Sequence, residues 1–481
     1  MKKQNHVSEK RKRRRKKNER KAIILAVLVV ISVIALAVTL AAFVFKADFF
    51  VGKNREEQKN RQENDAQPEI EVTVEDSTNQ NDRGGELDDT GLGQTDGSNP
   101  DQPDRSTVQK NENVEVLQDV TMIFAGDICF YDAYANMTAL RARGGKIESC
   151  IDEKLLAEMK AADICMVNNE FAYSDRGTPL ADKAFTFCSK PSNVSLLHDM
   201  GVDLVSLANN HVYDYGPDAL LDTLDTLKNA DIPYVGAGRD LSEASAVYYF
   251  EKNGRRIAFV SATQVERNEH PDTKGATDTT PGTFRCYTKD EFERLTAVIR
   301  EADAQADLTV VYVHWGTENT DELHWAQIEQ APQIVEAGAD LIIGDHPHCL
   351  QNVEYLNGVP VIYSLGNFWF NSKTLDTCLF KVIYRTDGKL DCRLIPARQH
   401  DCRTDMETGS EKQRILDYMQ CISPNVTFDQ DGNITNTPYT GPKIDYDAVE
   451  RVPDPPAAAT PLPAADPASP VPDNITPVPV Q

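Results

Sequence analysis

Residues 341–350 have the sequence LIIGDHPHCL, in which an apolar run passes into Gly-Asp and then into His-Pro-His. A short apolar run that ends at glycine is typical of a buried strand. The chain has nine histidines, and two of them flank Pro347 directly behind this strand. Because α/β folds bind ligands beyond the ends of their strands, the stretch predicts a ligand site at the edge of a sheet.

The rest of residues 116–445 alternates apolar runs of strand length with amphipathic runs of helix length. Asn253-Gly254 and Asn357-Gly358 mark the turns of two β-hairpins. Alternating strands and helices imply an α/β fold with layered sheets. The predicted strands are residues 120–126, 164–168, 202–208, 308–313 and 339–344, with a pair near 378–396, and the predicted helices are residues 147–163, 194–201, 218–230, 289–305 and 324–338, the last interrupted at Pro332.

Residues 22–45 contain no charged side chain, and they follow a basic segment, residues 1–21, with twelve Lys or Arg and two Glu. A helix of this length spans roughly 36 Å, which exceeds the ~30 Å hydrocarbon core of a membrane. The positive-inside rule puts residues 1–21 in the cytoplasm and the following domain outside. A cleaved signal peptide is the alternative, but its apolar region is normally about 7–15 residues long. We therefore expect a single-pass signal anchor in the cell membrane.

The flanks of the globular segment differ from it in composition. Residues 46–115 are polar and acidic, which predicts a disordered linker, and residues 446–481 are rich in Pro and Ala, which predicts a disordered tail. The net charge is −25, and the chain beyond residue 21 has 38 basic and 73 acidic residues. This acidic body argues against nucleic acid as a partner. None of the ten cysteines forms a CxxC pair, which argues against a zinc ribbon.

Polar side chains directly follow the successive predicted strands. Although they span about 240 residues, they should converge on one edge of the sheet. Taken alone, each has an ordinary structural explanation, since Asp127 could cap a helix and Asn209-Asn210 could form a turn. Their occurrence together at strand ends favours a metal or catalytic centre. The residues are Asp127, Asn169, Glu170, Asn209, Asn210, His211, His314, Glu318, Asp345, His346, His348, Ser364 and Asn367.

The donor types at these positions suit a divalent transition metal. Imidazole nitrogen, carboxylate oxygen and amide oxygen together are typical ligands of manganese, iron or zinc. Two such ions can activate a water nucleophile and hold the oxygens of a transferred phosphoryl group. His211, next to Asn210, is placed to protonate a leaving group. We therefore expect one or two divalent ions as cofactors.

The motifs in this order resemble the bacterial CapA family, which is linked to poly-γ-glutamate capsule synthesis. They are Gly126-Asp127, Asn168-Asn169-Glu170, Asn209-Asn210-His211 with Asp214 and Gly216, His314 with Gly316 and Glu318, Gly344 with His346-Pro347-His348, and residues 364–368. The resemblance covers about residues 120–400 and extends more distantly to the calcineurin-like metallophosphoesterases. It implies their four-layer sandwich, in which two mixed β-sheets are flanked by helices and carry a two-metal site.

The resemblance also implies roles for individual residues. His211 would be the proton donor, and Glu170 would replace the bridging aspartate of the phosphoesterases. The sequence departs from their first motif at Cys129, which stands in place of a histidine. Either this thiolate binds the ion, or the ion has a poorer shell, or only one ion binds. The implied metal ligands are Asp127, Glu170, Asn210, His314, His346 and His348, and the implied supporting or substrate residues are Asn169, Asn209, Asp214, Glu318, Asp345, Ser364 and Asn367.

These observations leave three hypotheses of function. We favour a membrane-anchored extracellular metal-dependent hydrolase of phosphoesterase type, which acts in the assembly, export or attachment of an anionic surface polymer such as poly-γ-glutamate. The alternative is a non-catalytic membrane component or polymer-binding scaffold of a capsule machinery, with other capsule-synthesis membrane proteins as partners. A cell-wall adhesion module is the third hypothesis, which the ordered motifs disfavour. Bound metal with phosphodiester turnover would support the first over the second.

Overall fold

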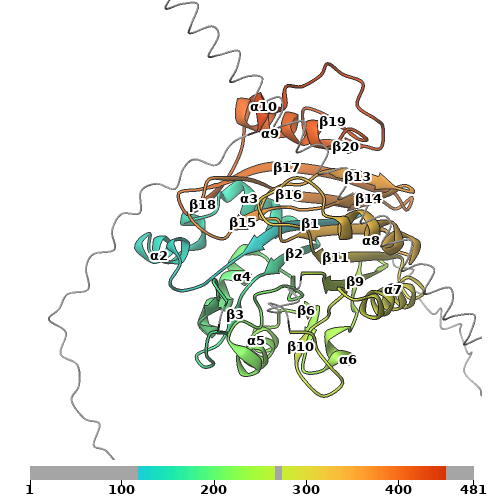
Figure 1. Ribbon diagram of the computed structural model, residues 1–481. Helices are drawn as coiled ribbons and strands as arrows, with labels where there is room; N and C mark the ends of the chain where they lie inside the picture. Colours follow the sequence, from blue (N-terminus) through green and yellow to red (C-terminus); the bar gives the residue numbers. More distant parts are fainter. Residues whose placement is uncertain (1–116, 182, 266–273, 451–481) are drawn as a thin grey trace, which may run out of the picture. The chain divides into compact units, whose positions relative to one another are not determined.

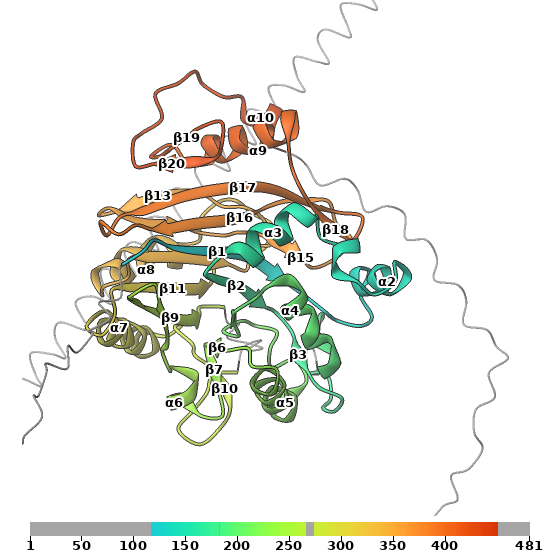
Figure 2. The same ribbon diagram turned by 180° about the vertical axis from the view of Figure 1, so that it is seen from behind.

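The structure is a computed structural model that describes residues 117–181, 183–265 and 274–450. The predicted basic segment, membrane anchor and linker, residues 1–115, lie outside the described residues, as does the tail from residue 451. Within the described ranges, no helix combines the length and the apolar character that a membrane span needs. Two large β-sheets with helices on their outer faces make up this part of the chain (Figures 1 and 2).

The first sheet has ten strands, in the order β19-β20-β17-β16-β1-β2-β5-β6, with β15 paired to β1 and β18 paired to β17. β1, β2, β5 and β6 run parallel to one another, whereas β16 is antiparallel to β1. The sheet is therefore mixed, and its parallel half directs several carboxyl ends to one edge. The strands are β1 (Val120–Ile128), β2 (Ile164–Asn169), β5 (Leu204–Ser206), β6 (Tyr234–Val235), β15 (Asn367–Trp369), β16 (Leu375–Tyr384), β17 (Leu390–His400), β18 (Arg403–Met406), β19 (Thr427–Phe428) and β20 (Asn433–Thr435).

The second sheet has six strands, in the order β13-β14-β12-β11-β9-β8. β9, β11, β12 and β14 are parallel, and the hairpins β8–β9 and β13–β14 close its two ends. Both hairpins turn where predicted, because Asn253 and Asn357 adopt positive φ angles of 53° and 52° before a glycine. The strands are β8 (Tyr248–Lys252), β9 (Arg255–Thr263), β11 (Leu308–His314), β12 (Leu341–Asp345), β13 (Val353–Leu356) and β14 (Val359–Ile362), and two short pairs are β3 (Ala172–Tyr173) with β4 (Cys188–Ser189) and β7 (Ala237–Gly238) with β10 (Gly282–Thr283).

Helices cover the outer face of each sheet. α2 to α5 pack on the first sheet and α6 to α8 pack on the second, whereas α9, with α10 beside it, packs against β17 as part of the apolar layer between the sheets (Figures 1 and 2). The helices are α2 (Ala135–Ala142), α3 (Glu153–Ala161), α4 (Ser195–Met200), α5 (Gly216–Asn229), α6 (Leu241–Ala244), α7 (Lys289–Asp303), α8 (Trp325–Glu336), α9 (Gly409–Ile422) and α10 (Tyr446–Val449), with 3-10 turns at η1 (Ile147–Ser149) and η2 (Pro191–Val194).

The alternation of side chains along the strands produces the layers. In β1, Met122 and Phe124 are buried between the two sheets, whereas Ile123 and Ala125 pack against the helices of the first sheet. In β11, Val310 faces the layer between the sheets and Val311 faces the helices of the second sheet. Both strands are thus apolar on two faces, which is why their sequences are continuous apolar runs. The expected mixed α/β fold with helix-flanked sheets is confirmed.

Three details of the sequence prediction are wrong. Residues 147–163 do not form one helix, because Ile151 pairs with Thr404 and Asp152 caps the separate helix α3. α8 is not interrupted at Pro332, since buried neighbours on its inner face hold the helix together. The tail does not begin at residue 446, because α10 packs against α9 and buries Val449.

Candidate metal centre

The carboxyl edges of both sheets meet at one place and deliver the predicted polar residues there. Asp127 lies at the end of β1, and Glu170 directly follows β2. His314 is the last residue of β11, and His346 directly follows β12. Asn210 comes from the loop behind β5 and lies 2.9 Å from His314 through its side-chain oxygen. The structure therefore brings together side chains from both sheets.

Two glycines allow the sheets to approach each other at this edge. An added Cβ at Gly126 would collide with the carbonyl oxygen of Gly366, and one at Gly344 would collide with that of Tyr363. The backbone of Asp127 donates to Gly366 at 3.0 Å, and that of Leu365 donates to Gly344 at 3.2 Å. The segment 363–366 therefore runs between β1 and β12 and joins the two sheets beside the site.

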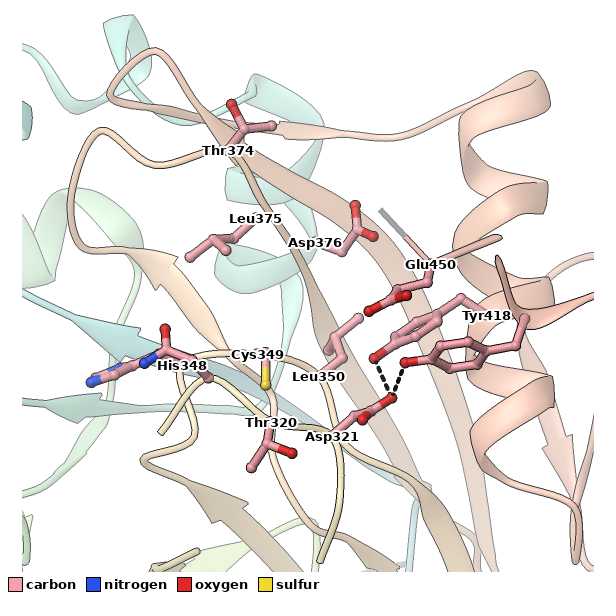
Figure 3. Close-up of a pocket in the computed structure, with 12 residues that line it drawn as sticks. Thr320, Asp321, His348, Cys349, Leu350, Thr374, Leu375, Asp376, Tyr418 and Glu450 are labelled. Atoms are coloured by element: carbon pink, nitrogen blue, oxygen red, sulfur yellow. Dashed lines mark hydrogen bonds between the residues drawn. The ribbon is translucent and has the colours of Figure 1, made fainter. Parts of the chain in front are cut away.

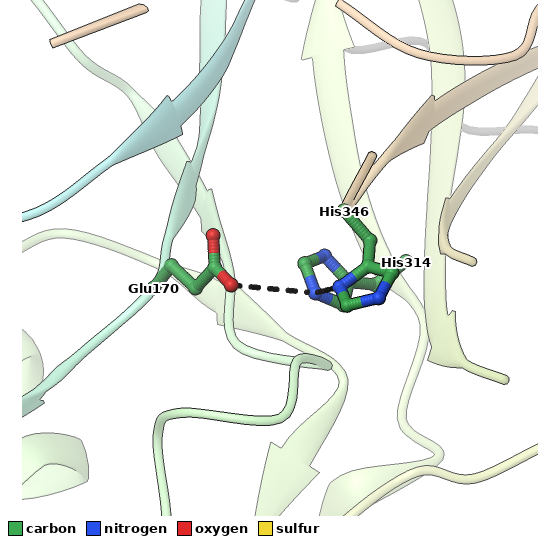
Figure 4. A group of neighbouring side chains, drawn as sticks. All are labelled: Glu170, His314 and His346. Carbon is green, nitrogen blue, oxygen red and sulfur yellow. Dashed lines mark hydrogen bonds and ion pairs between the residues drawn. The ribbon is translucent and has the colours of Figure 1, made fainter. Parts of the chain in front are cut away.

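Among the residues that the structure describes, two groups could hold a cation, and Glu170, His314 and His346 form the first (Figure 4). The Nε2 atom of His314 lies 3.5 Å from Glu170 Oε1 and 3.1 Å from His346 Nδ1. Ligand atoms that share one ion at about 2.0–2.2 Å in tetrahedral geometry lie roughly 3.3–3.6 Å apart. The observed separations are close to this spacing, so the group has the dimensions of a metal shell.

Asp127, Glu170 and His348 form the second group, and Glu170 belongs to both. His348 Nδ1 lies 3.1 Å from Asp127 Oδ2 and 2.9 Å from Asn367 Oδ1. Only the ring of His348 retains some exposure, with 16% of its side chain accessible, whereas Asp127 and Glu170 are fully buried. A carboxylate shared by two groups could bridge two neighbouring cations.

The carboxylate of Glu170 tests whether these residues fit a metal. Both of its oxygens are fully buried, and neither has a hydrogen-bond partner. A buried carboxylate without a hydrogen bond is costly unless a positive charge compensates it. Neutral imidazole nitrogens complete the donor set that manganese, iron or zinc prefers. The residues therefore fit a divalent transition metal, with Glu170 between two positions.

The charges at the site lead to the same conclusion. Burial, followed by repulsion from Asp127 and Asp345, holds the pKa of Glu170 well above its usual value. Burial lowers the pKa of His314 to about 3, and burial together with His314 and His348 lowers the pKa of His346 well below its usual value. The two imidazoles are therefore neutral, which is the form that binds a metal.

The His-Pro-His stretch adopts a strained backbone. His346 has a φ angle of 100° and His348 one of 58°, a region that residues other than glycine rarely occupy. Strain of this kind persists where the surrounding structure enforces it, most often at functional sites. This backbone conformation turns the imidazole of His346 toward His314 and that of His348 toward Asp127. The two histidines thus serve different groups.

His211 lies beside the two groups. Its Nδ1 is 2.8 Å from Asp214 Oδ2, and its Nε2 is 3.8 Å from Glu170 Oε1. A carboxylate only accepts hydrogen bonds, so Nδ1 carries the proton and Nε2 faces the candidate metal positions. Burial is the main cause that lowers the pKa of His211. The geometry leaves Nε2 able to take up a proton and pass it on, as the predicted proton donor must.

The predicted supporting residues have different roles in the structure, and only some of them orient the site. Asn209 donates to Asn168 and to the backbone of Asn169, and Asn367 contacts His348, so both orient the site. Asp345 instead accepts a short hydrogen bond from Tyr312 and one from the backbone of Leu365. Ser364 donates to the backbone carbonyl of Cys349, and Asn169 donates to that of Phe171, so both side chains hold loops in place. Glu318 is exposed and belongs to neither candidate metal group.

Cys129 is packed among apolar residues of the first sheet. Burial raises the pKa of its thiol well above the usual value, and the thiol is in neither of the two groups found among the described residues. Of the three alternatives given for the first motif, binding of the ion by the Cys129 thiolate is therefore not supported. The roles of the other site residues stay predictions.

Three of the residues that sequence reasoning missed contact side chains of the site. Asn168 was quoted within a motif but given no role, yet its amide donates to Asp127 at 2.8 Å and lies 3.2 Å from His314. Phe187 and Phe370 pack against His211 and His348 at ring distances of 4.3 and 5.2 Å. The position of Asn168 in the strand-end motif was a usable signal, whereas the two phenylalanines follow no predicted strand.

Two cavities open from the site. One, of about 370 Å³, is lined by Asn210 and His346 and by Glu318, Tyr287 and Trp325. The other, of about 280 Å³, begins at His348 and ends at Tyr418 and Tyr446, whose hydroxyl groups both donate to Asp321 (Figure 3). The described linings of these cavities contain no Lys or Arg, so positive charge for an anionic substrate would have to come from bound cations.

Comparison with known proteins matches residues 121–372 to the family described as Bacterial capsule synthesis protein PGA_cap. The chain is 33% identical to the PGA biosynthesis protein CapA of Bacillus subtilis (strain 168) over 241 residues, which are 49% of this chain and 61% of that protein. It is also 33% identical to the capsule biosynthesis protein CapA of Bacillus anthracis over 240 residues, which are 49% of this chain and 57% of that protein. The matches thus span about three fifths of these relatives.

A more distant relative is a probable polyglutamine synthesis accessory protein of Mycobacterium tuberculosis, with 27% identity over 44% of this chain and 56% of that protein. A solved structure of a hypothetical protein from Thermus thermophilus covers 58% of this chain and 99% of its own, with a TM-score of 0.34 and 16% identity. So low a score supports no argument. The family match includes every residue of the two candidate metal groups.

Proposed function

Because the chain belongs to the bacterial capsule synthesis family PGA_cap, as its motifs led us to expect, we propose that it is a metal-dependent hydrolase of phosphoesterase type that serves capsule synthesis. Its polymer would be anionic, and poly-γ-glutamate is the first candidate because of the names of its relatives. The proposal includes the predicted anchor at residues 22–45, a cell-membrane location with an extracellular domain, and other capsule-synthesis membrane proteins as partners.

The observation that carries the proposal is the convergence on Glu170. Two groups of buried donors share this carboxylate, and its oxygens have no hydrogen-bond partner. The residues that would hold the cations are Asp127, Glu170, Asn210, His314, His346 and His348. The layered sheets and the position of these residues at the carboxyl edges support the proposal that the fold is that of the calcineurin-like metallophosphoesterases.

The chain's own residues supply positioning and proton transfer. Bound cations would lower the pKa of water and hold the oxygens of the substrate. Asn168 and Asn367 orient Asp127 and His348 through hydrogen bonds. His211 would take up a proton at Nε2 from the attacking water and deliver it to the leaving group, while its Nδ1 proton stays on the hydrogen bond to Asp214. Phe187 packs against the ring of His211 and Phe370 against the ring of His348, and each phenylalanine excludes water from one side of that ring.

A non-catalytic scaffold role is the second candidate, and one observation favours it. The second group offers a single imidazole, from His348, and the packed Cys129 stands where the phosphoesterases place a histidine. A cation there would have few protein ligands. The site would then hold metal for structure or for polymer binding, without turnover.

Turnover by the full chain reconstituted with manganese, iron or zinc separates these two candidates. The probes are bis(4-nitrophenyl) phosphate and a γ-glutamyl 4-nitroanilide, and the comparison is the His211→Asn variant with its metal content checked. The hydrolase proposal predicts release of nitrophenol or nitroaniline, reduced about 100-fold or more in the variant without loss of metal. Metal-loaded protein that cleaves neither probe, or that cleaves them equally well without His211, would leave the scaffold role.

A further inference from the structure

The segment 183–187, which follows none of the strands that end at the site, holds the expected proton donor in place. Lys183 lies 2.6 Å from Asp214 Oδ1 through its ammonium group, and it also donates a short hydrogen bond to the carbonyl of Asn210. Only 8% of the Lys183 side chain is exposed. Its ammonium group therefore contacts protein groups, and these belong to the turn that carries Asn210 and His211.

Phe187, from the same segment, makes two further contacts. Its backbone N–H donates to Asp214 Oδ2 at 2.7 Å, the same oxygen that lies 2.8 Å from His211. Its ring lies 4.3 Å from the imidazole of His211, at an interplanar angle of 32°. One segment thus contacts the carboxylate at both oxygens and covers the histidine ring.

Together these donors occupy the whole carboxylate. Oδ1 of Asp214 is held by Lys183, and Oδ2 by the backbone of Phe187 and by His211. Asp214 itself is fully buried, so water does not replace a missing donor at low cost. With Oδ1 held, the carboxylate cannot rotate, and Oδ2 stays directed at Nδ1 of the imidazole.

We propose that Lys183 is a positioning residue that, with Phe187, fixes His211 in the tautomer with its proton on Nδ1 and its Nε2 toward Glu170. This inference rests on the proposed function for its catalytic meaning, because the tautomer matters only if His211 transfers protons. The placement of the side chains does not depend on it. Lys183 acts through Asp214 and through the carbonyl of Asn210, and it makes no contact with the reacting groups.

The test compares the wild-type full chain with Lys183→Met and Lys183→Arg. Long-range ¹H–¹⁵N spectra of the metal-free protein give the tautomer of His211, which the His211→Asn variant assigns. We expect the Nδ1-protonated form in the wild type, a mixture of tautomers in Lys183→Met, and recovery in Lys183→Arg. In the metal-loaded protein, kcat for bis(4-nitrophenyl) phosphate should fall about 10- to 100-fold in Lys183→Met, with KM within about twofold.

Lys190→Met, an exposed lysine of the same stretch, is the matched control and should match the wild type in both measurements. If Lys183→Met does not fold, Lys183→Gln serves as the second neutral variant. An unchanged tautomer and kcat in the folded neutral variant would overturn the inference. A wild type that shows the expected tautomers but turns over no probe would contradict the proposed hydrolase and leave the positioning role intact.

Discussion

At the scale of single residues, the site depends on Glu170 more than on any histidine. It is the one side chain common to both candidate metal groups, and its buried oxygens lack hydrogen bonds. Such a carboxylate destabilises the metal-free protein and becomes favourable only when cations are present. The proposed metal site would therefore link the stability of the fold to metal binding through this residue.

Replacing Glu170 by Gln should remove most of the effect of metal on stability. We expect Glu170→Gln to lose most of its metal and, in chelator, to be more stable than the wild type by about 1–3 kcal/mol, because the metal-free wild type must either protonate this carboxyl or bury its charge, as its raised pKa indicates. Urea denaturation with and without chelator measures both effects. Glu301→Gln, at an exposed position of α7, is the control. A variant that binds as much metal as the wild type would contradict the bridging role.

At the scale of elements, the site requires the two sheets to come close at their carboxyl edges. Gly126 in β1 and Gly344 in β12 leave room for the segment 363–366, which joins the strands by hydrogen bonds. The Gly-Asp pairs in the sequence thus have a packing reason besides any chemical one. The backbone of Asp127 is held by the same segment.

Gly126→Ala tests this arrangement. The added methyl group would meet a backbone carbonyl, which cannot move away as a flexible side chain can. We expect a loss of about 1–3 kcal/mol in the free energy of unfolding, measured in urea, and weaker metal binding because Asp127 is displaced. Gly388→Ala, where an added Cβ meets no atom but φ is 85°, should cost only its backbone strain, about 1 kcal/mol, and leave metal content unchanged. Equal behaviour of the two variants would contradict the packing role.

The elements also show how far the sequence alone could predict the structure. β1, β11 and β12 were predictable because strands buried on both faces are continuous apolar runs. The break between η1 and α3 was not, because it depends on pairing with Thr404, a residue more than 250 positions away. The strand-end residues of the site could be predicted as well, because each directly follows one of these apolar runs. Lys183 was missed, because its role comes from a loop that folds back on the site.

At the scale of the whole molecule, the chain is acidic although the proposed substrate is anionic. The net charge is −25, and Glu318 and Asp321 line the cavities that open from the site. Such surroundings repel a polyanion unless cations are bound. Metal would therefore be needed for substrate approach as well as for chemistry, which makes metal binding the central claim.

Elemental analysis of the full chain, beside the His346→Ala/His348→Ala double variant, tests that claim most directly. We predict about one or two equivalents of manganese, iron or zinc per wild-type chain. The double variant should lose the metal while its circular dichroism remains that of the folded protein, since each group would lose one imidazole. A wild type without metal after reconstitution with all three ions, or a double variant that retains it, would contradict the account.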